Sequence, residues 1–157
     1  MKIVSLIEDK KIEKRIAITP EIVKKYISTG FEVCLPKNYG FHLGFDDEMY
    51  KNEGVSIIED EKKLIDDSDV IVQLSLPPEE KLAMFKENQT LVGVLNPFIN
   101  KDKIEKLIKK KVNSFSLELL PRITRAQSMD ILSSQANLAG YKAVIESFAN
   151  YEKAIPM

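Results

Sequence analysis

Several residue types on which functional sites depend are scarce or missing in this sequence. Cys34 is the single cysteine and His42 the single histidine among 157 residues. One cysteine excludes an internal disulfide and suits a reducing compartment. The sequence also contains no G-x-G-x-x-G motif, no P-loop, no pair of histidines and no cysteine cluster. We therefore predict no metal site and no phosphate cradle of a dinucleotide site within this chain, and we assign His42 to a surface or turn position.

Charge of one sign and long apolar runs are missing as well. Lysine and arginine together number 23 and aspartate and glutamate 24, so nothing in the charge favours nucleic acid or an anionic membrane as a partner. No apolar run approaches the roughly 18 residues that a membrane-spanning helix needs. The apolar content of 44% is sufficient for one domain with a buried core. We expect a soluble, cytoplasmic protein without direct membrane insertion.

Short apolar runs alternate with helical patterns along most of the chain. This order predicts βαβ units and a mainly parallel sheet. Thr19 and Pro20 mark one helix start, as N-cap and first helical residue, and Gly30 marks the end of that helix. The predicted strands are residues 3–7, 31–35, 55–58, 69–76, 91–95 and 112–118. The predicted helices between them include residues 59–66, 79–86 and 100–110.

A long helix is predicted at about residues 128–153, which is on the order of 30 Å at 1.5 Å per residue. One face carries small residues around Gly140, and another carries Tyr141, Val144, Phe148 and Tyr151. A helix this apolar needs a covering surface. That surface is either its own sheet or something beyond the sheet.

The loop between the last predicted strand and this helix concentrates the polar chemistry of the chain. Arg122 is suited to a phosphate or carboxylate in bidentate fashion. Asp130 is suited to ribose hydroxyls, and Gln127 or Ser133 to an amide such as a carboxamide. Ligands of open α/β sheets are usually bound by such strand-to-helix loops.

A purely structural interpretation of the same loop is equally open from residue types alone. Asp130 or Ser128 then serves as an N-cap, and Arg122 or Arg125 pairs with Glu118. Arg15, which lies just before the first helix, poses the same choice between a substrate carboxylate and a surface salt bridge.

Residues 118–145 closely resemble the α subunit of proton-translocating NAD(P) transhydrogenase. Two further segments agree: residues 15–20 (RIAITP) resemble the opening motif shared by transhydrogenases and alanine dehydrogenases, and residues 30–33 (GFEV) match the strand after it. The resemblance implies a Rossmann-like (flavodoxin-like) α/β domain with helices on both faces of the sheet. It also implies a second, glycine-rich NAD-binding domain, which these 157 residues lack. By itself the chain is then a fragment or one piece of a split subunit, and we expect it to bind dinucleotide weakly or not at all.

The resemblance also assigns roles within the loop. Arg122 and Asp130 would contact NAD(H), Ser133 would help to hold the same end of it, and Gln127 would face NADP(H) on a partner domain. Orientation of the two nicotinamides would supply most of the catalysis, without a catalytic acid or base. The implied partners are membrane and NADP(H)-binding subunits and a second copy in a homodimer. The implied location is cytoplasmic and peripheral to the inner membrane.

The sequence departs from alanine dehydrogenases at two strands. Those enzymes have a substrate-binding lysine in the strand that matches residues 69–77 and a catalytic histidine in the one that matches residues 91–98. This chain has Gln73 and Ser75 in the first and Asn96 in the second, which disfavours an amino-acid dehydrogenase and leaves Arg15 as a family remnant or an ion pair. The alternatives to transhydrogenase are an alanine dehydrogenase-like oxidoreductase and a non-catalytic dimerisation module.

Overall fold

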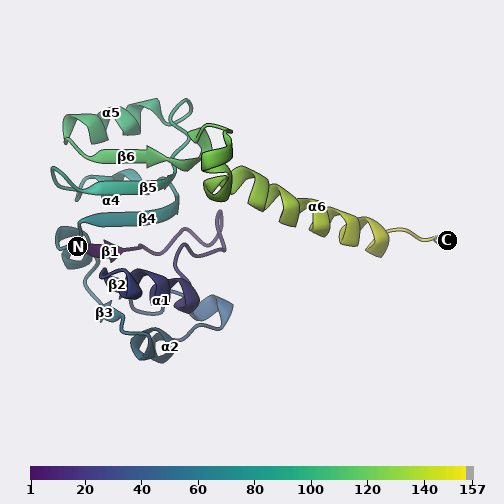
Figure 1. The fold of residues 1–157 in the computed structure, drawn as a ribbon, viewed down its shortest axis with the longest axis horizontal. Coiled ribbons are helices and arrows are strands. Elements are labelled where there is room, and N and C mark those ends of the chain that lie inside the picture. The colour runs from purple at the N-terminus through teal and green to yellow at the C-terminus, as the bar shows by residue number, and fades with distance from the viewer. Residues whose placement is uncertain (155–157) are drawn as a thin grey trace. The chain divides into compact units, whose positions relative to one another are not determined.

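The structure, a computed structural model, describes residues 1–154 and divides into two compact units (Figure 1). The first unit, Met1–Ser116, contains the whole sheet, and the second, Leu117–Met157, contains the loop and the long helix. The boundary between the two units coincides with the end of the last strand.

The first unit is built on a six-stranded parallel sheet in the order β3-β2-β1-β4-β5-β6 (Figure 1). Every pair of neighbouring strands is parallel, as the alternation of apolar runs and helices predicts. The strand order reverses direction between β1 and β4, which makes the carboxyl ends of these two strands the topological switch point. The strands are β1 (Lys2–Val4), β2 (Glu32–Pro36), β3 (Ser56–Ile58), β4 (Val70–Ser75), β5 (Thr90–Val94) and β6 (Asn113–Ser116).

Local capping signals set the helix starts of this unit. Helix α1 begins at Pro20 after Thr19, and Gly30 follows its end with a φ of 87°, so both predicted boundaries are confirmed. Asp46 and Asp60 each accept hydrogen bonds from backbone N–H groups of the helix that follows. The helices are α1 (Pro20–Ser28), α2 (Asp47–Asn52), α3 (Glu61–Asp66), α4 (Glu79–Leu82) and α5 (Lys101–Lys109), with a 3-10 turn at η1 (Phe41–Leu43).

Helices cover both faces of the sheet, and the alternation of side chains along the strands shows how. Ile3 belongs to one buried cluster and its neighbour Val4 to another. The Ile3 cluster contains Val23 of α1 and Tyr50 of α2. The Val4 cluster is completed by apolar residues of α3, α4 and α5, namely Leu64, Ile65, Leu82 and Leu107. The predicted α/β Rossmann-like sheet with helices on both faces is confirmed.

A buried polar network holds the long β1–α1 connection against the sheet. The Tyr39 hydroxyl lies 2.8 Å from the Ser5 hydroxyl and accepts from the backbone N–H groups of Ala17 and Ile18, at 3.0 and 3.3 Å. The Gln73 side-chain carbonyl accepts from the Ser5 hydroxyl at 2.9 Å. These bonds satisfy polar groups inside the core and fix the connection on which Arg15 lies.

The second unit consists of two 3-10 turns, η2 (Leu117–Leu119) and η3 (Thr124–Met129), followed by α6 (Ile131–Ala149). Two predicted boundaries are corrected here. The last strand ends at Ser116 because the chain turns into η2, and the long helix begins at Ile131 because residues 124–129 form η3. Within residues 1–154, the structure contains no helix of the length and apolarity needed to cross a membrane.

Candidate functional site: the loop from Pro121 to Ser133

Short-range hydrogen bonds shape the loop that leads into α6. The backbone N–H of Ile123 donates to the Pro121 carbonyl, and that of Ala126 donates to the Ile123 carbonyl, both at 2.9 Å. Ala126 is buried, so it anchors η3 while its neighbours stay exposed. In a 3-10 turn, residues three apart lie on one side. This geometry places Thr124, Gln127 and Asp130 along a common edge.

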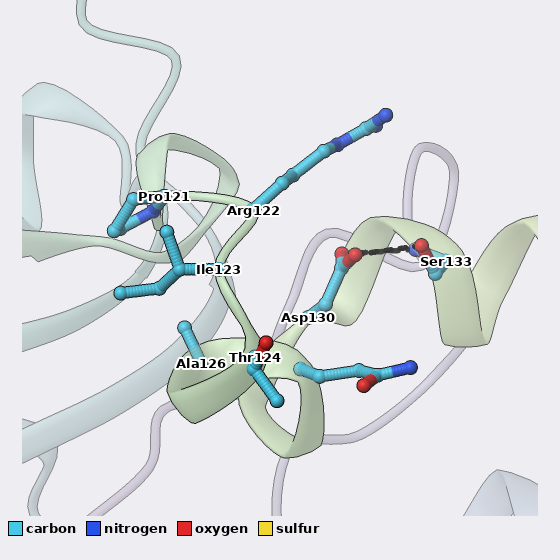
Figure 2. A pocket seen from close by; sticks show the side chains of 8 residues that line it. Pro121, Arg122, Ile123, Thr124, Ala126, Asp130 and Ser133 are labelled. Carbon is cyan, nitrogen blue, oxygen red and sulfur yellow. Dashed lines mark hydrogen bonds between the residues drawn. The ribbon is translucent and has the colours of Figure 1, made fainter.

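Asp130 is the N-cap of α6 and is bound to Ser133. One carboxylate oxygen accepts from the Ser133 backbone N–H at 3.0 Å, and the other accepts from the Ser133 hydroxyl at 2.6 Å (Figure 2). The hydroxyl bond, then the backbone bond, and to a smaller extent the positive charge of Arg122, lower the pKa of the Asp130 carboxyl. The predicted N-cap role is therefore confirmed for Asp130, and the site keeps an ionised carboxylate at neutral pH.

The four predicted site residues line one hollow of about 300 Å³. Arg122 and Ser133 lie among its lining residues together with Gln127 and Asp130. The Arg122 side chain is extended, and across residues 1–154 it forms no ion pair or hydrogen bond (Figure 2). The alternative pairing of Arg122 or Arg125 with Glu118 is not found among these residues. The hollow thus combines a guanidinium, a carboxylate, an amide and a hydroxyl with the apolar surfaces of Pro121, Ile123 and Ala126.

A second polar hollow, of about 310 Å³, lies in the first unit. It is lined by Gln73, Ser75 and Asn96, the three residues at which the sequence departs from alanine dehydrogenases, and by Glu8. Glu8 crosses from the end of β1 to accept from the backbone N–H groups of Leu74 and Ser75, at 2.8 and 3.3 Å, and from the Ser75 hydroxyl. Sequence reasoning missed Glu8, because its partners lie more than 60 residues away and no local pattern marks them.

Arg15 and His42 both have structural partners. The Arg15 guanidinium donates to both carboxylate oxygens of Glu13, at 2.9 and 2.6 Å, and this bond is the main cause that lowers the pKa of the Glu13 carboxyl. The Nε2 atom of His42 lies 2.8 Å from the Lys14 carbonyl on the exposed surface. The predicted ion pair of Arg15 and the predicted surface position of His42 are confirmed.

Comparison with known proteins identifies the family. The sequence profile described as "Alanine dehydrogenase/PNT, N-terminal domain" matches residues 6–139. The chain belongs to the alanine dehydrogenase/PNT N-terminal domain family. The predicted resemblance to transhydrogenases is confirmed by relatives at up to 42% identity over the whole chain.

Three relatives illustrate how far the similarity extends within the alanine dehydrogenase/PNT family. An NAD(P) transhydrogenase subunit alpha of Rickettsia prowazekii is 42% identical over all of this chain and 42% of its own length. The crystal structure of transhydrogenase from Sinorhizobium meliloti matches with a TM-score of 0.89 and 35% identity, over 99% of this chain and 46% of that one. Alanine dehydrogenase 1 of Staphylococcus aureus is 31% identical over 88% of this chain and 36% of its own length. The chain spans less than half the length of each of these relatives.

Proposed function

We propose that this chain is the N-terminal portion of the NAD(H)-binding component of a proton-translocating NAD(P) transhydrogenase. The observation that carries the proposal is the common hollow of Arg122, Gln127, Asp130 and Ser133. Similarity to transhydrogenases over the whole chain supports it. A hollow of about 300 Å³ is at the lower end of the roughly 300–1,000 Å³ of ligand pockets, so it suits one end of a dinucleotide rather than the whole.

The lining residues suit the nicotinamide end of NAD(H). Arg122, without an ion pair among the described residues, is available to bind a phosphate in bidentate fashion. The ionised Asp130 accepts from ribose hydroxyls, and Ser133 supports that carboxylate through its two hydrogen bonds. Gln127 faces the second nucleotide, NADP(H), on a partner domain. Hydride then passes directly from one nicotinamide to the other, and these residues act by holding and orienting, with no proton to remove.

The proposal includes partners that supply what residues 1–157 do not contain. A glycine-rich domain, of the kind that binds a dinucleotide pyrophosphate at a helix N-terminus, holds the rest of NAD(H). Membrane and NADP(H)-binding subunits couple hydride transfer to proton movement, and two copies of the component form a homodimer. The component is then cytoplasmic and peripheral to the inner membrane.

The test is NADH binding by calorimetry to the full-length subunit that contains this chain. We expect Arg122→Ala to weaken NADH binding about 10- to 100-fold, which corresponds to one lost charge-assisted hydrogen-bonding group. Asp130→Asn removes the carboxylate charge but retains a good N-cap residue, so a loss of affinity there reports on the ligand and not on α6. Arg125→Ala is the matched control, because Arg125 does not line the hollow. Wild-type affinity in both Arg122→Ala and Asp130→Asn would contradict the site.

An alanine dehydrogenase-like activity is the second candidate, supported by 31% identity to alanine dehydrogenase 1. The hydrogen bonds at the hollow of the first unit argue against it. The Gln73 side-chain carbonyl is occupied by Ser5 and the Leu6 backbone, Ser75 is bound to Glu8, and Arg15 is bound to Glu13. Oxidation of NADH by the full-length subunit that depends on pyruvate and ammonium would favour this candidate over transhydrogenation.

A further inference from the structure

Two separate hollows share the polar edge of the second unit. The hollow described above and a second one, of about 440 Å³, are both lined by Gln127, Asp130 and Ser133. The second hollow is completed by residues that the first does not use, from the end of η3 and the first two turns of α6: Ser128, Met129, Ile131, Ser134 and Asn137. The three shared residues therefore form a partition with a hollow on each side.

The two hollows differ in charge. The first contains the Arg122 guanidinium, whereas the lining of the second contains no lysine or arginine, and its single charged group is the Asp130 carboxylate. A phosphate is therefore disfavoured in the second hollow. A neutral dihydropyridine or a positively charged pyridinium ring is compatible with it, and Met129, which is 54% exposed, provides an apolar surface for the face of such a ring.

Asn137 is placed to recognise a carboxamide. It lies four residues after Ser133 and seven after Asp130, so the three residues follow one face of α6. Its primary amide has one acceptor and two donors, which is the complement of another primary amide. Across residues 1–154 the Asn137 side chain makes no hydrogen bond, while the nearby Ser134 hydroxyl donates to the Ile131 carbonyl at 3.1 Å and keeps its lone pairs.

We propose that the second hollow receives the nicotinamide ring of the second nucleotide, with the Asn137 amide paired to the ring carboxamide and the Ser134 hydroxyl beside it. This inference rests on the proposed transhydrogenase function and adds two residues to it. Gln127, Asp130 and Ser133 then stand between the two nucleotides, and the cation-free hollow belongs to the nucleotide whose phosphates are held by the partner domain. The surface of α6 thus contributes directly to both substrates.

The test uses the full-length subunit with its NADP(H)-binding partner domain loaded with NADPH. We expect Asn137→Ala to lower the affinity of the subunit for the loaded partner domain about three- to tenfold, measured by the change in NADPH fluorescence on mixing. The KM for NADP(H) in transhydrogenation should rise with it, while the affinity for NADH measured by calorimetry stays at the wild-type value. Ser134→Ala should act in the same direction and more weakly.

Matched controls lie further along the same helix. The Ser147 hydroxyl donates to a helix carbonyl as that of Ser134 does, and the Asn150 amide donates to the Glu146 carbonyl, so Ser147→Ala and Asn150→Ala should leave NADPH fluorescence and KM unchanged. Equal values for Asn137→Ala and Asn150→Ala would overturn the inference. An equal loss of NADH affinity in Asn137→Ala would also overturn it, by placing Asn137 with the first nucleotide. Failure of the proposed function itself is recognised separately, from unchanged NADH binding in Arg122→Ala.

Discussion

At the scale of single residues, Tyr39 has the largest structural role that the sequence does not reveal. Its ring is 1% exposed, and its hydroxyl joins Ser5 to two backbone N–H groups of the β1–α1 connection. We predict that Tyr39→Phe destabilises the protein by about 1–3 kcal/mol, because the ring still fills the core but the N–H groups of Ala17 and Ile18 lose their acceptor. Urea unfolding measures the difference.

The control for this substitution is Tyr26→Phe. Tyr26 packs edge-to-face on Phe31, with ring centroids 6.3 Å apart, and no hydrogen bond of its hydroxyl is found among residues 1–154. Removal of that hydroxyl should change the free energy of unfolding by less than about 0.5 kcal/mol. If both variants unfold at the same urea concentration, the Tyr39 network contributes nothing to stability.

At the scale of elements, the start of α6 depends on one ionised carboxylate. The hydrogen bonds from Ser133 lower the pKa of Asp130 in the folded chain, so their stabilising effect is present above the unfolded pKa of about 3.9 and is lost as the pH falls through the lower, folded value. We predict that the Ser133 backbone N–H exchanges faster with solvent below about pH 4, as seen by NMR. Asp130→Asn should remove this pH dependence, and an Asp130→Asn chain with an unchanged pH profile would contradict the assignment.

Elements with a local signal were predicted well from the sequence. The start of α1 follows from Thr19 and Pro20, and the start of α2 from Asp46, which accepts from the Met49 N–H at 2.8 Å. The turn η3 was missed because a short 3-10 segment has no 3.6-residue apolar period, so residues 128–130 were assigned to the helix. At the candidate site, residue types left Asp130 open between cap and ligand contact. Only the folded chain brings Glu8 to Ser75 or Asn137 into line with Ser133.

At the scale of the whole molecule, stability is distributed unequally between the two units. The first unit contains both buried clusters, whereas Ala126 is the one buried residue described in residues 117–154. From its second residue onward α6 is exposed throughout, including Leu138, Tyr141 and Phe148. A helix that is apolar on every side is normally covered, and a 19-residue helix without packing is only marginally stable in water.

This inequality predicts two levels of hydrogen-exchange protection in residues 1–157. Amides of α6 should exchange orders of magnitude faster than those of β4 and β5, because opening α6 removes almost no buried apolar surface while opening the central strands disrupts both clusters. In the full-length subunit, where the proposed second domain and second copy are present, the same amides should become protected, whereas those of β4 and β5 should change little. Exchange measured by mass spectrometry on both proteins provides the comparison. Fast exchange of α6 in the full-length subunit would mean that neither partner covers this helix.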